Sequence, residues 1–325
     1  MRSPDSGQCG LGSWTPARAE FAASGNEEQH YRQVGEVTPM GVMARSEIQA
    51  DDHAIASFRG RTVVVEYGGA AMEQAHLRDG FSRDIAAIRL AGVNPVVVHG
   101  GGRRMSRLRE AAEKRIPRFV GDPRVTHDET MRLVERALAT TNDEIARLID
   151  GHGVEAVGSS AWPDQIVRAC PREPLLPAGE SVDLGRVGDV AGVNARPIRA
   201  LQERGIVPII GPLGIGADGR TYNIDADLVA GEVAAVLGAD LVIYLTDAPG
   251  ILDRAGRRFR RLSRWAVDSL VREGLIDGRM LPKIEGCVRA LKGGAAQAQL
   301  VDGRVPHAVP MTLRAPHGVG TEIVL

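Results

Sequence analysis

Strand and helix patterns alternate along most of this chain, and this alternation restricts the fold more than any other feature of the sequence. The segment TVVVE, residues 62–66, is a run of β-branched residues typical of a short buried strand. It is followed by four apolar residues whose spacings of four, four and three place them on one helix face: Leu77, Phe81, Ile85 and Ile88. A strand, a helix and a second strand in this order predict parallel strands joined by a helix that packs against the sheet.

The alternation continues along the chain. Further strands are expected at about 95–99, 206–210 and 240–245, and further helices at about 103–115, 129–150, 225–238, 264–273 and 280–291. Short apolar pieces separated by Gly and Asp, between about residues 165 and 193, are typical of hairpins. We therefore predict an α/β fold, a three-layer αβα sandwich around a central and mostly parallel sheet. Ligands of such sheets bind beyond the carboxyl ends of the strands.

The composition fits a globular protein and argues against several classes of function. The chain has 325 residues, of which 43% are hydrophobic and 25% charged, so its length allows one large domain or two lobes. A formal net charge of −1 and an aromatic content of 4% give no sign of a nucleic-acid or membrane surface. No apolar run approaches the ~20 residues that span a bilayer. The three cysteines are widely separated, which favours a reducing, cytoplasmic compartment over a disulfide framework.

The N-terminal part of the chain differs from the rest. It is rich in Gly, Ser, Pro and charged residues, and it shows little hydrophobic periodicity. Such a segment buries too little apolar surface to order itself. We therefore predict that residues 1–50 form a mobile N-terminal extension.

Two of the expected strands end in glycine-rich turns. Gly68 and Gly69 follow the first strand, and the sequence HGGG at residues 99–102 closes the second. Glycine permits positive φ and has no Cβ, so backbone N–H groups in such turns can converge on an anion. Neither turn matches a common nucleotide-binding motif, and each one alone could be a tight turn without a ligand. Two such turns at one edge of a sheet favour a phosphate-binding site.

Polar residues suited to a site follow in the second half of the chain. Asn223, Asp225 and Asp227 lie at the start of an expected helix. A carboxylate there can accept hydrogen bonds from the free N–H groups of the helix start, so one of the two aspartates could serve only as a helix cap. Lys283 lies at the start of a later helix, where a lysine is usually solvated unless the helix start faces a cleft.

Seven segments, taken in order, resemble the amino acid kinase superfamily and, within it, the acetylglutamate kinases. They are YGGAAM, PVVVHGGG, GDPRVTHDETM, VGDVAGVN, YNIDAD, LTDAPGILD and GRMLPKIEGCVRAL. The resemblance implies ATP-dependent phosphorylation of the γ-carboxylate of N-acetylglutamate, or of a related acylated acidic amino acid, to an acyl phosphate, with Mg²⁺ held largely by the nucleotide's phosphates. It also implies an N-terminal lobe, 51–204, for acyl amino acid binding and dimerisation, and a C-terminal lobe, 205–325, for ATP binding.

The resemblance implies a role for each matching residue. Substrate binding would fall to Gly101, Gly102, Arg124 and Asn223. Nucleotide binding would fall to Gly68, Gly69, Thr246, Asp247 and Gly250. Lys283 would neutralise the phosphates, and Asp227 would orient a catalytic lysine.

Glu66 departs from the family pattern at the centre of the mechanism. The family has a lysine at this position, against the transferring phosphoryl group, whereas this chain has a carboxylate. Unit charges ~4 Å apart interact by about 4 kcal/mol at an effective dielectric constant near 20, so the exchange opposes catalysis. Three hypotheses follow. The protein is a kinase in which Arg279 or Arg103 supplies the missing charge and pairs with Glu66. It is a catalytically impaired homologue that binds nucleotide or acyl amino acid as a regulatory protein. Or it phosphorylates a different carboxylate in a specialised pathway.

Segments at both ends of the folded part resemble those of arginine-inhibited members of the family. They are IQADDHAIASFRG, GRVPHAVP and GVGTEIVL. The resemblance implies a homodimer, with a hexamer and arginine as an effector as further alternatives. Ala54 stands where the N-terminal helix of those members has an aromatic residue, which argues against the hexamer.

Overall fold

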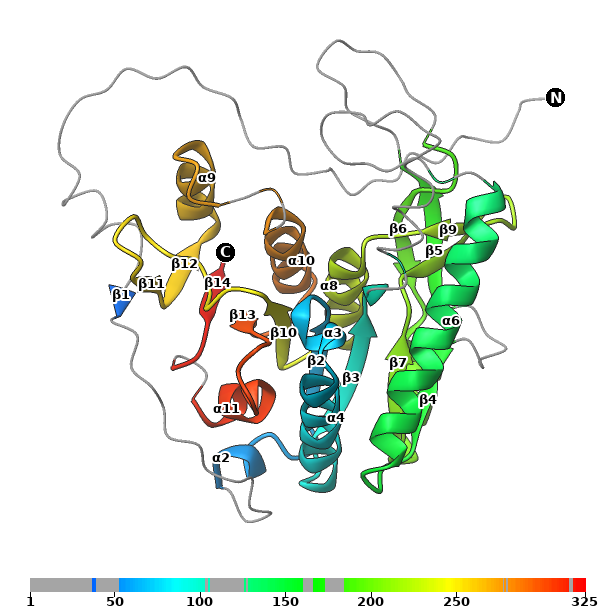
Figure 1. The fold of residues 1–325 in the computed structure, drawn as a ribbon, viewed down its shortest axis with the longest axis horizontal. Coiled ribbons are helices and arrows are strands. Elements are labelled where there is room, and N and C mark those ends of the chain that lie inside the picture. Colours follow the sequence, from blue (N-terminus) through cyan, green and yellow to red (C-terminus); the bar gives the residue numbers. More distant parts are fainter. Residues whose placement is uncertain are drawn as a thin grey trace, which may run out of the picture.

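An eight-stranded sheet forms the centre of the computed structural model (Figure 1). The structure describes residues 37–38, 53–102, 105, 126, 128–159, 166–172, 184–276, 278, 280–315 and 318–325. The strand order in the sheet is β12-β14-β13-β10-β2-β3-β7-β4. In that order the strands are Arg261–Ser263, Thr321–Val324, Ala298–Asp302, Leu241–Thr246, Thr62–Tyr67, Asn94–His99, Val207–Ile210 and Ala156–Gly158.

The sheet is mostly parallel, as the alternation of strands and helices predicts. β10 pairs in parallel with β13 and β2, β2 with β3, and β7 with both β3 and β4. Only the edge beyond β13 reverses direction, because β14 runs antiparallel to β13 and β12 runs parallel to β14. The predicted α/β class with a mostly parallel central sheet is therefore confirmed.

Helices cover both faces of this sheet (Figure 1). One hydrophobic cluster joins the sheet to α7 (Ala195–Glu203), α8 (Ala226–Leu237), α9 (Arg264–Arg272) and α10 (Leu281–Lys292). A second cluster joins the other face to α2 (His53–Ala56), α4 (Ala75–Leu90), α6 (Asp128–Asp150) and α11 (Ala308–Arg314). The molecule therefore has the three layers expected of an αβα sandwich.

The alternation of side chains along β2 decides where Glu66 points. Val63 and Val65 belong to the cluster with α4 and α6, whereas Val64 belongs to the cluster with α8 and α10. Successive side chains of a strand point to opposite faces, so Glu66 shares a face with Val64. A buried acid at this position therefore lies on the side of the sheet covered by α8 and α10.

Two smaller sheets complete the described part of the chain. Four strands in the order β6-β5-β8-β9 comprise Gly188–Val193, Val167–Pro171, Leu213–Gly216 and Thr221–Asn223. β5 and β6 are antiparallel, as predicted for the hairpin region. β1 (Val37–Thr38) pairs with β11 (Arg258–Phe259). The other residues of the predicted N-terminal extension lie outside the described residues, and the division into two lobes stays a prediction.

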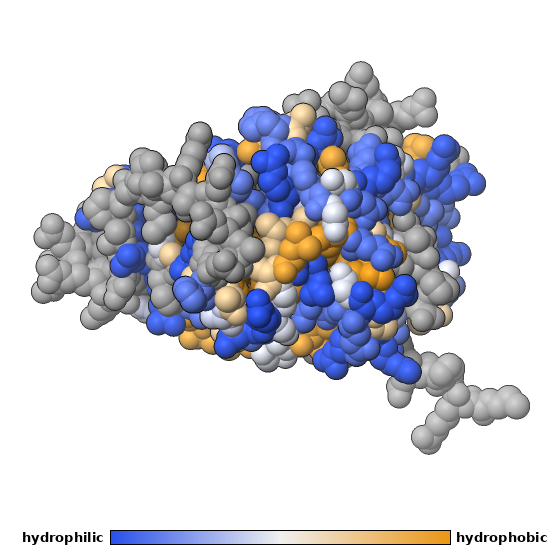
Figure 2. Space-filling view, turned by 90° about the horizontal axis from the view of Figure 1, so that it is seen from below, coloured by the Kyte–Doolittle hydropathy of each residue, from blue (hydrophilic) through white to orange (hydrophobic). Residues whose placement is uncertain are grey.

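Two further features bear on the sequence-based expectations. Within the described ranges, no helix is long and apolar enough to cross a membrane. Cys287 is free and buried. Figure 2, which views the molecule from below, shows apolar surface gathered in the middle of that face among hydrophilic side chains.

Candidate functional site

The carboxyl ends of β2, β3 and β10 lie side by side, and the predicted glycine turns and catalytic residues lie there. Tyr67 is in register with His99, and Glu66 with Tyr244. The Gly100 N–H donates a hydrogen bond of 3.0 Å to the Tyr67 carbonyl, which joins the turn after β2 to the turn after β3. The expectation that both glycine turns meet at one edge of the sheet is therefore met.

Lys283 lies between two buried carboxyl groups. Its Nζ is 2.7 Å from Glu66 Oε2 and 2.8 Å from Asp227 Oδ1. The Lys283 side chain is 17% exposed and the Glu66 side chain 3%, so the pair is largely shielded from water. The fold thus brings together the three residues predicted as catalytic, from β2, α8 and α10.

Glu66 has a partner, Lys283, that was not proposed for it from the sequence. We expected Glu66 to pair with Arg279 or Arg103, and both arginines lie outside the described residues, as does Arg124. Lys283 was assigned to the phosphates and not to Glu66. The replacement of a lysine by Glu66 therefore changes the surroundings of the second lysine as well as the charge at its own position.

Burial and mutual charge shift the protonation of this cluster. Burial raises the pKa of Glu66, and Lys283 opposes that rise. Burial raises the pKa of Asp227 to about 7, and the charge of Glu66 adds to the effect. Burial would lower the pKa of Lys283, but Asp227 and Glu66 together raise it well above its usual range. Lys283 therefore stays protonated, while the carboxyl groups compete for protons.

Asp225 has a structural role that the sequence left open. Its Oδ1 accepts a hydrogen bond of 2.9 Å from the Asp227 N–H, so it is the N-cap of α8. Burial and then the charge of Asp227 raise the pKa of Asp225 to about 6. Of the two aspartates, Asp225 caps the helix and Asp227 contacts Lys283.

The first glycine turn is shaped by two carboxyl groups of the chain itself. Gly69 has a φ of +59°, and a Cβ on it would lie 2.5 Å from Asp247 Oδ1. The same Asp247 oxygen accepts a hydrogen bond of 2.7 Å from the Ala70 N–H, at the start of α3 (Ala70–Glu73). A Cβ on Gly68 would lie 2.8 Å from Glu66 Oε1. The close approach of Asp247 and Glu66 therefore explains why both positions are glycine.

The second glycine turn is held by a buried histidine. His99 Nδ1 donates to the Gly100 carbonyl at 2.8 Å, and His99 Nε2 accepts from Asn142 Nδ2 at 3.0 Å. Burial lowers the pKa of His99 to about 4, so the imidazole is neutral at pH 7. The sequence did not single out Asn142, because an asparagine inside a helix carries no motif.

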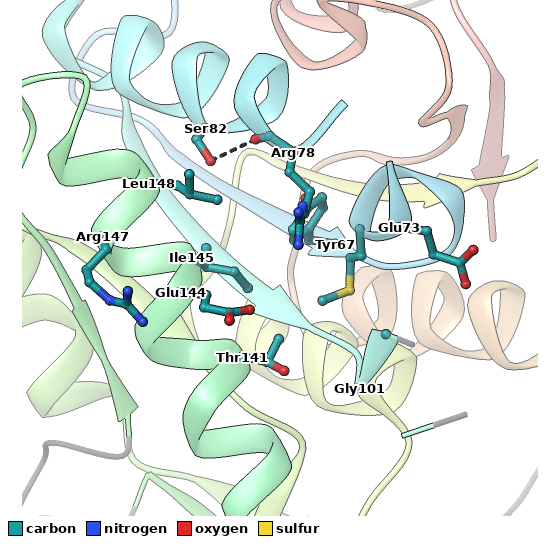
Figure 3. A pocket seen from close by; sticks show the side chains of 12 residues that line it. Tyr67, Glu73, Arg78, Ser82, Gly101, Thr141, Glu144, Ile145, Arg147 and Leu148 are labelled. Atoms are coloured by element: carbon teal, nitrogen blue, oxygen red, sulfur yellow. Dashed lines mark hydrogen bonds between the residues drawn. The ribbon is translucent and has the colours of Figure 1, made fainter. Parts of the chain in front are cut away.

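A cavity of about 440 Å³ opens beside this second turn, on the α4 and α6 side of the sheet (Figure 3). Figure 3 shows Arg78 reaching into it from α4 and Glu144 from α6. Its lining residues are Tyr67, Met72, Glu73, Arg78, Ser82, Gly101, Gly102, Thr141, Glu144, Ile145, Arg147 and Leu148. The cavity therefore contains two of the predicted substrate-binding residues, whereas the Lys283 cluster lies on the other face of the sheet.

The comparisons with known proteins agree with this geometry. Residues 61–302 match the model of the amino acid kinase family. The chain belongs to the amino acid kinase family. The acetylglutamate kinase of Oleidesulfovibrio alaskensis is 43% identical to it over 272 residues, which are 82% of this chain and 92% of the relative. The acetylglutamate kinase of Nitrosococcus oceani is 41% identical over 277 residues, 83% and 92% of the two chains.

Two solved structures share the fold. An N-acetylglutamate synthase from Neisseria gonorrhoeae, complexed with coenzyme A and N-acetyl-glutamate, matches with a TM-score of 0.72 and 24% identity over 84% of this chain. This amino acid kinase spans only 61% of the length of that synthase. Carbamate kinase from Giardia lamblia, bound to AMP-PNP, matches with a TM-score of 0.59 and 18% identity over 81% of this chain and 98% of that chain.

Other predicted residues of this amino acid kinase shape the loops around the cluster. Thr246 Oγ1 donates to the Ala248 carbonyl at 2.6 Å, which closes a turn directly after β10. Gly250 has a φ of +129°, and a Cβ on it would lie 2.5 Å from Thr321 Oγ1. The Asn223 N–H donates to the Arg186 carbonyl at 2.8 Å, at the end of β9. Contacts of these residues with a ligand stay predictions.

An ion-pair network connects the Lys283 helix of this amino acid kinase to the four-stranded sheet. Arg289, on α10, lies 3.1 Å from Asp189 of β6 and 2.7 Å from Glu285 of its own helix. A third carboxylate, Glu232 of α8, lies 3.5 Å away. Within the described ranges, no group of three or more His, Cys, Asp or Glu side chains is arranged to hold a metal ion.

Proposed function

We propose that this protein is an acetylglutamate kinase-like phosphotransferase, which uses ATP to phosphorylate the γ-carboxylate of N-acetylglutamate or of a related acylated acidic amino acid. One observation carries the proposal: both glycine turns and the Lys283 cluster meet at the carboxyl ends of β2, β3 and β10. The two acetylglutamate kinases cited above, each covered over 92% of its length, support it. Such a product belongs to biosynthesis of the arginine and ornithine type.

The reaction requires positioning and charge neutralisation. An oxygen of the substrate carboxylate attacks the γ-phosphorus of ATP and forms a P–O bond. The bond from that phosphorus to the bridging oxygen breaks, and its electron pair leaves with ADP, so no proton is transferred. Lys283 lies beside the first glycine turn as a fixed positive charge, which favours the developing negative charge. Magnesium would be held largely by the nucleotide's phosphates.

The remaining site residues fit this reaction as proposals. Arg124 would grip the substrate's α-carboxylate, because a guanidinium matches a carboxylate with two parallel donors. Asn223 would donate its amide to the same group, beside Gly101 and Gly102. The loop with Thr246, Asp247 and Gly250 would line the nucleotide site of the C-terminal lobe.

Glu66 favours a second candidate function. Because it takes Lys283 as a partner at 2.7 Å, part of the lysine's charge is already neutralised before a phosphate arrives. A homologue of this kind could bind a nucleotide or an acyl amino acid with impaired transfer and act as a regulatory protein. A rebuilt pocket for a different carboxylate is the other alternative.

Product trapping and calorimetry separate these candidates. The purified protein is incubated with Mg-ATP and N-acetylglutamate, the acyl phosphate is trapped with hydroxylamine, and ADP is quantified. N-acetylaspartate and N-acetyl-2-aminoadipate test shorter and longer carboxylates, and Lys283→Met is the matched inactive variant. Trapped product that depends on Lys283 supports the kinase. Binding of ATP in calorimetry without any product supports the regulatory protein, and no binding of ATP, ADP or any acyl amino acid contradicts both.

Assembly, effector and location are further parts of the proposal. The resemblance to arginine-inhibited relatives supports a homodimer, with a hexamer and arginine as an effector as further alternatives. A kinase that consumes ATP is expected in the cytoplasm. Titration with arginine while the oligomer mass is recorded tests the effector, and an unchanged mass and activity would remove it.

A further inference from the structure

We propose that Glu66 and Asp227 share one proton, and that this proton on Glu66 replaces the family lysine as the hydrogen-bond donor to the phosphoryl group at the Gly68–Gly69 turn. The inference rests on the proposed phosphotransfer, because it names the donor that the reaction needs at this position. It makes Glu66 a catalytic residue in its neutral form and Asp227 its partner.

One carboxyl oxygen of Glu66 contacts Lys283 and the other faces the first glycine turn. Oε2 accepts from Lys283 Nζ at 2.7 Å. Oε1 faces the turn, since it would lie 2.8 Å from a Cβ on Gly68. A protonated Oε1 therefore presents its O–H to the turn while Oε2 keeps the lysine. Lys283 also binds Asp227 Oδ1 at 2.8 Å, which holds the two carboxyl groups on either side of one cation.

The surroundings of Glu66 favour a retained proton. Among the described residues, α8 contributes Asp227 and Asp225, and α10 contributes Lys283. Tyr244 of β10 and Cys287 of α10 stay neutral, because burial raises the pKa of each well above its usual range. Full ionisation would leave the carboxylates of Glu66 and Asp227 on either side of one lysine, with the partly exposed Asp225 nearby. Burial raises the pKa of both Glu66 and Asp227 although Lys283 opposes the rise, and the charge of Glu66 raises the pKa of Asp227 further. The two carboxyl groups therefore titrate as a pair that keeps a proton.

Nucleotide binding should strengthen this protonation. A terminal phosphate at the turn brings negative charge to the side of Glu66 that faces away from Lys283. A nearby like charge disfavours the ionised carboxylate, so the shared proton moves to Glu66 and a missing one is taken from solvent. The proton then stays on Glu66 throughout the transfer, because the reaction exchanges no proton.

Isosteric amides separate the two carboxyl groups. Glu66→Gln supplies a permanent neutral donor, so it should keep transfer within about tenfold of the wild type and lose the fall in rate at high pH. Asp227→Asn removes the partner that keeps the proton in place, so at pH 8 Glu66 depends on solvent for it and transfer should fall on the order of 100-fold or more. Glu203→Gln, at an exposed position on α7, is the matched control. Loss of transfer in Glu66→Gln together with a functional wild type would overturn the inference and leave the proposed function intact.

Two measurements on the wild type do not depend on any variant folding. Calorimetry of ATP binding in buffers of different ionisation enthalpy should show uptake approaching one proton at pH 8 and little at pH 6, where the pair already holds its proton.

The infrared spectrum of the unliganded protein at pH 7 should contain a protonated carboxyl band, which both Glu66→Gln and Asp227→Asn remove and Glu203→Gln keeps. ATP binding without proton uptake, or a band unchanged in both amides, overturns the shared proton. If no acyl amino acid is phosphorylated, the proposed function fails, and the infrared result still decides the proton.

Discussion

Gly231 on α8 and Gly286 on α10 face each other where the two helices cross. A Cβ on Gly231 would lie 2.5 Å from the Gly286 carbonyl oxygen, and a Cβ on Gly286 would overlap the Tyr244 hydroxyl. Because both positions lack a side chain, the helix backbones approach closely. Their first turns then bring Asp227 and Lys283 within hydrogen-bond distance.

The substitution Gly286→Ala should therefore damage both stability and the site. The added methyl group has no room between the helices, and overpacking of this kind lowers the free energy of unfolding by about 1–3 kcal/mol. Displacement of α10 should also weaken the contact of Lys283 with Asp227 and reduce phosphotransfer. Urea denaturation and the product-trapping assay measure the two effects.

Gly80 provides the control for that experiment. It lies inside α4, and a Cβ on it would meet nothing within 4 Å. Alanine is the better helix former, so Gly80→Ala should raise the free energy of unfolding by roughly 0.5–1 kcal/mol. Equal losses of stability in both variants would show that the helix crossing has no special role.

Glu66→Lys should increase phosphotransfer. The substitution places a positive charge beside the first glycine turn and frees Lys283 from one of its two carboxyl partners. An interaction of unit charges at ~4 Å is worth about 4 kcal/mol at an effective dielectric constant near 20, so even a partial gain corresponds to a rate increase of about tenfold or more. Turnover by wild type and variant at pH 6, 7 and 8 is the measurement. A variant slower than the wild type at every pH would contradict the assignment of Glu66 to the phosphoryl group.

The position of the site was accessible from the sequence, because strand alternation and glycine turns are local patterns. The alternation in TVVVE is sufficient to place Glu66 on the same face as Val64. The partner of Glu66 was not accessible, since Lys283 lies 217 residues away and a lysine at a helix start usually faces solvent. The buried lysine depends on the crossing of two helices at glycines, and no short motif marks that crossing.

One strand that the sequence analysis missed has polar residues at buried positions. β13 has the sequence AQLVD, and its Gln299 is fully buried while Asp302 is 9% exposed. Polar residues at buried positions hide the hydrophobic pattern of a strand. Glycines are ambiguous for another reason. Gly250 packs against Thr321 and Gly69 against Asp247, yet a glycine at either position could equally have allowed a ligand to approach the backbone.

Asp225 should act on stability through its cap more than through its charge. Asp225→Asn keeps an oxygen that can accept from the Asp227 N–H, whereas Asp225→Ala removes it. The alanine variant should therefore be less stable than the asparagine variant by about 1 kcal/mol. Asn194→Ala removes the equivalent cap of α7, where Asn194 Oδ1 accepts from the Arg196 N–H at 3.2 Å, and should lose a similar amount. Chemical denaturation of the three variants tests this, and equal stability of the two Asp225 variants would reject the cap.

His99 should destabilise the fold as the pH falls. Its pKa is about 4 in the folded protein and 6.5 without burial, so between these values the unfolded chain binds a proton that the native protein excludes. Stability from this group is complete above pH 6.5 and is lost on acidification, by about 2 kcal/mol between pH 7 and pH 5. His99→Gln has no such group, so the difference in free energy of unfolding between wild type and variant should decrease by that amount from pH 7 to pH 5. Asp84, Asp225 and Asp227 contribute in the opposite direction, and they cancel in the comparison of wild type with variant. A stability difference independent of pH would show that His99 takes up its proton equally readily in the folded and unfolded chain.

The carboxylate of Asp247 already occupies the Ala70 amide at the first glycine turn. An incoming phosphate that used this amide would have to exchange with a tethered competitor of the same charge. The observed rate constant for association would then reach a plateau, set by the rate at which Asp247 releases the Ala70 amide, instead of rising linearly with nucleotide concentration. Removal of the Asp247 side chain would raise the association rate of the nucleotide and leave the turn open to any small anion. Asp247 would therefore select ligands through the rate of association rather than through affinity.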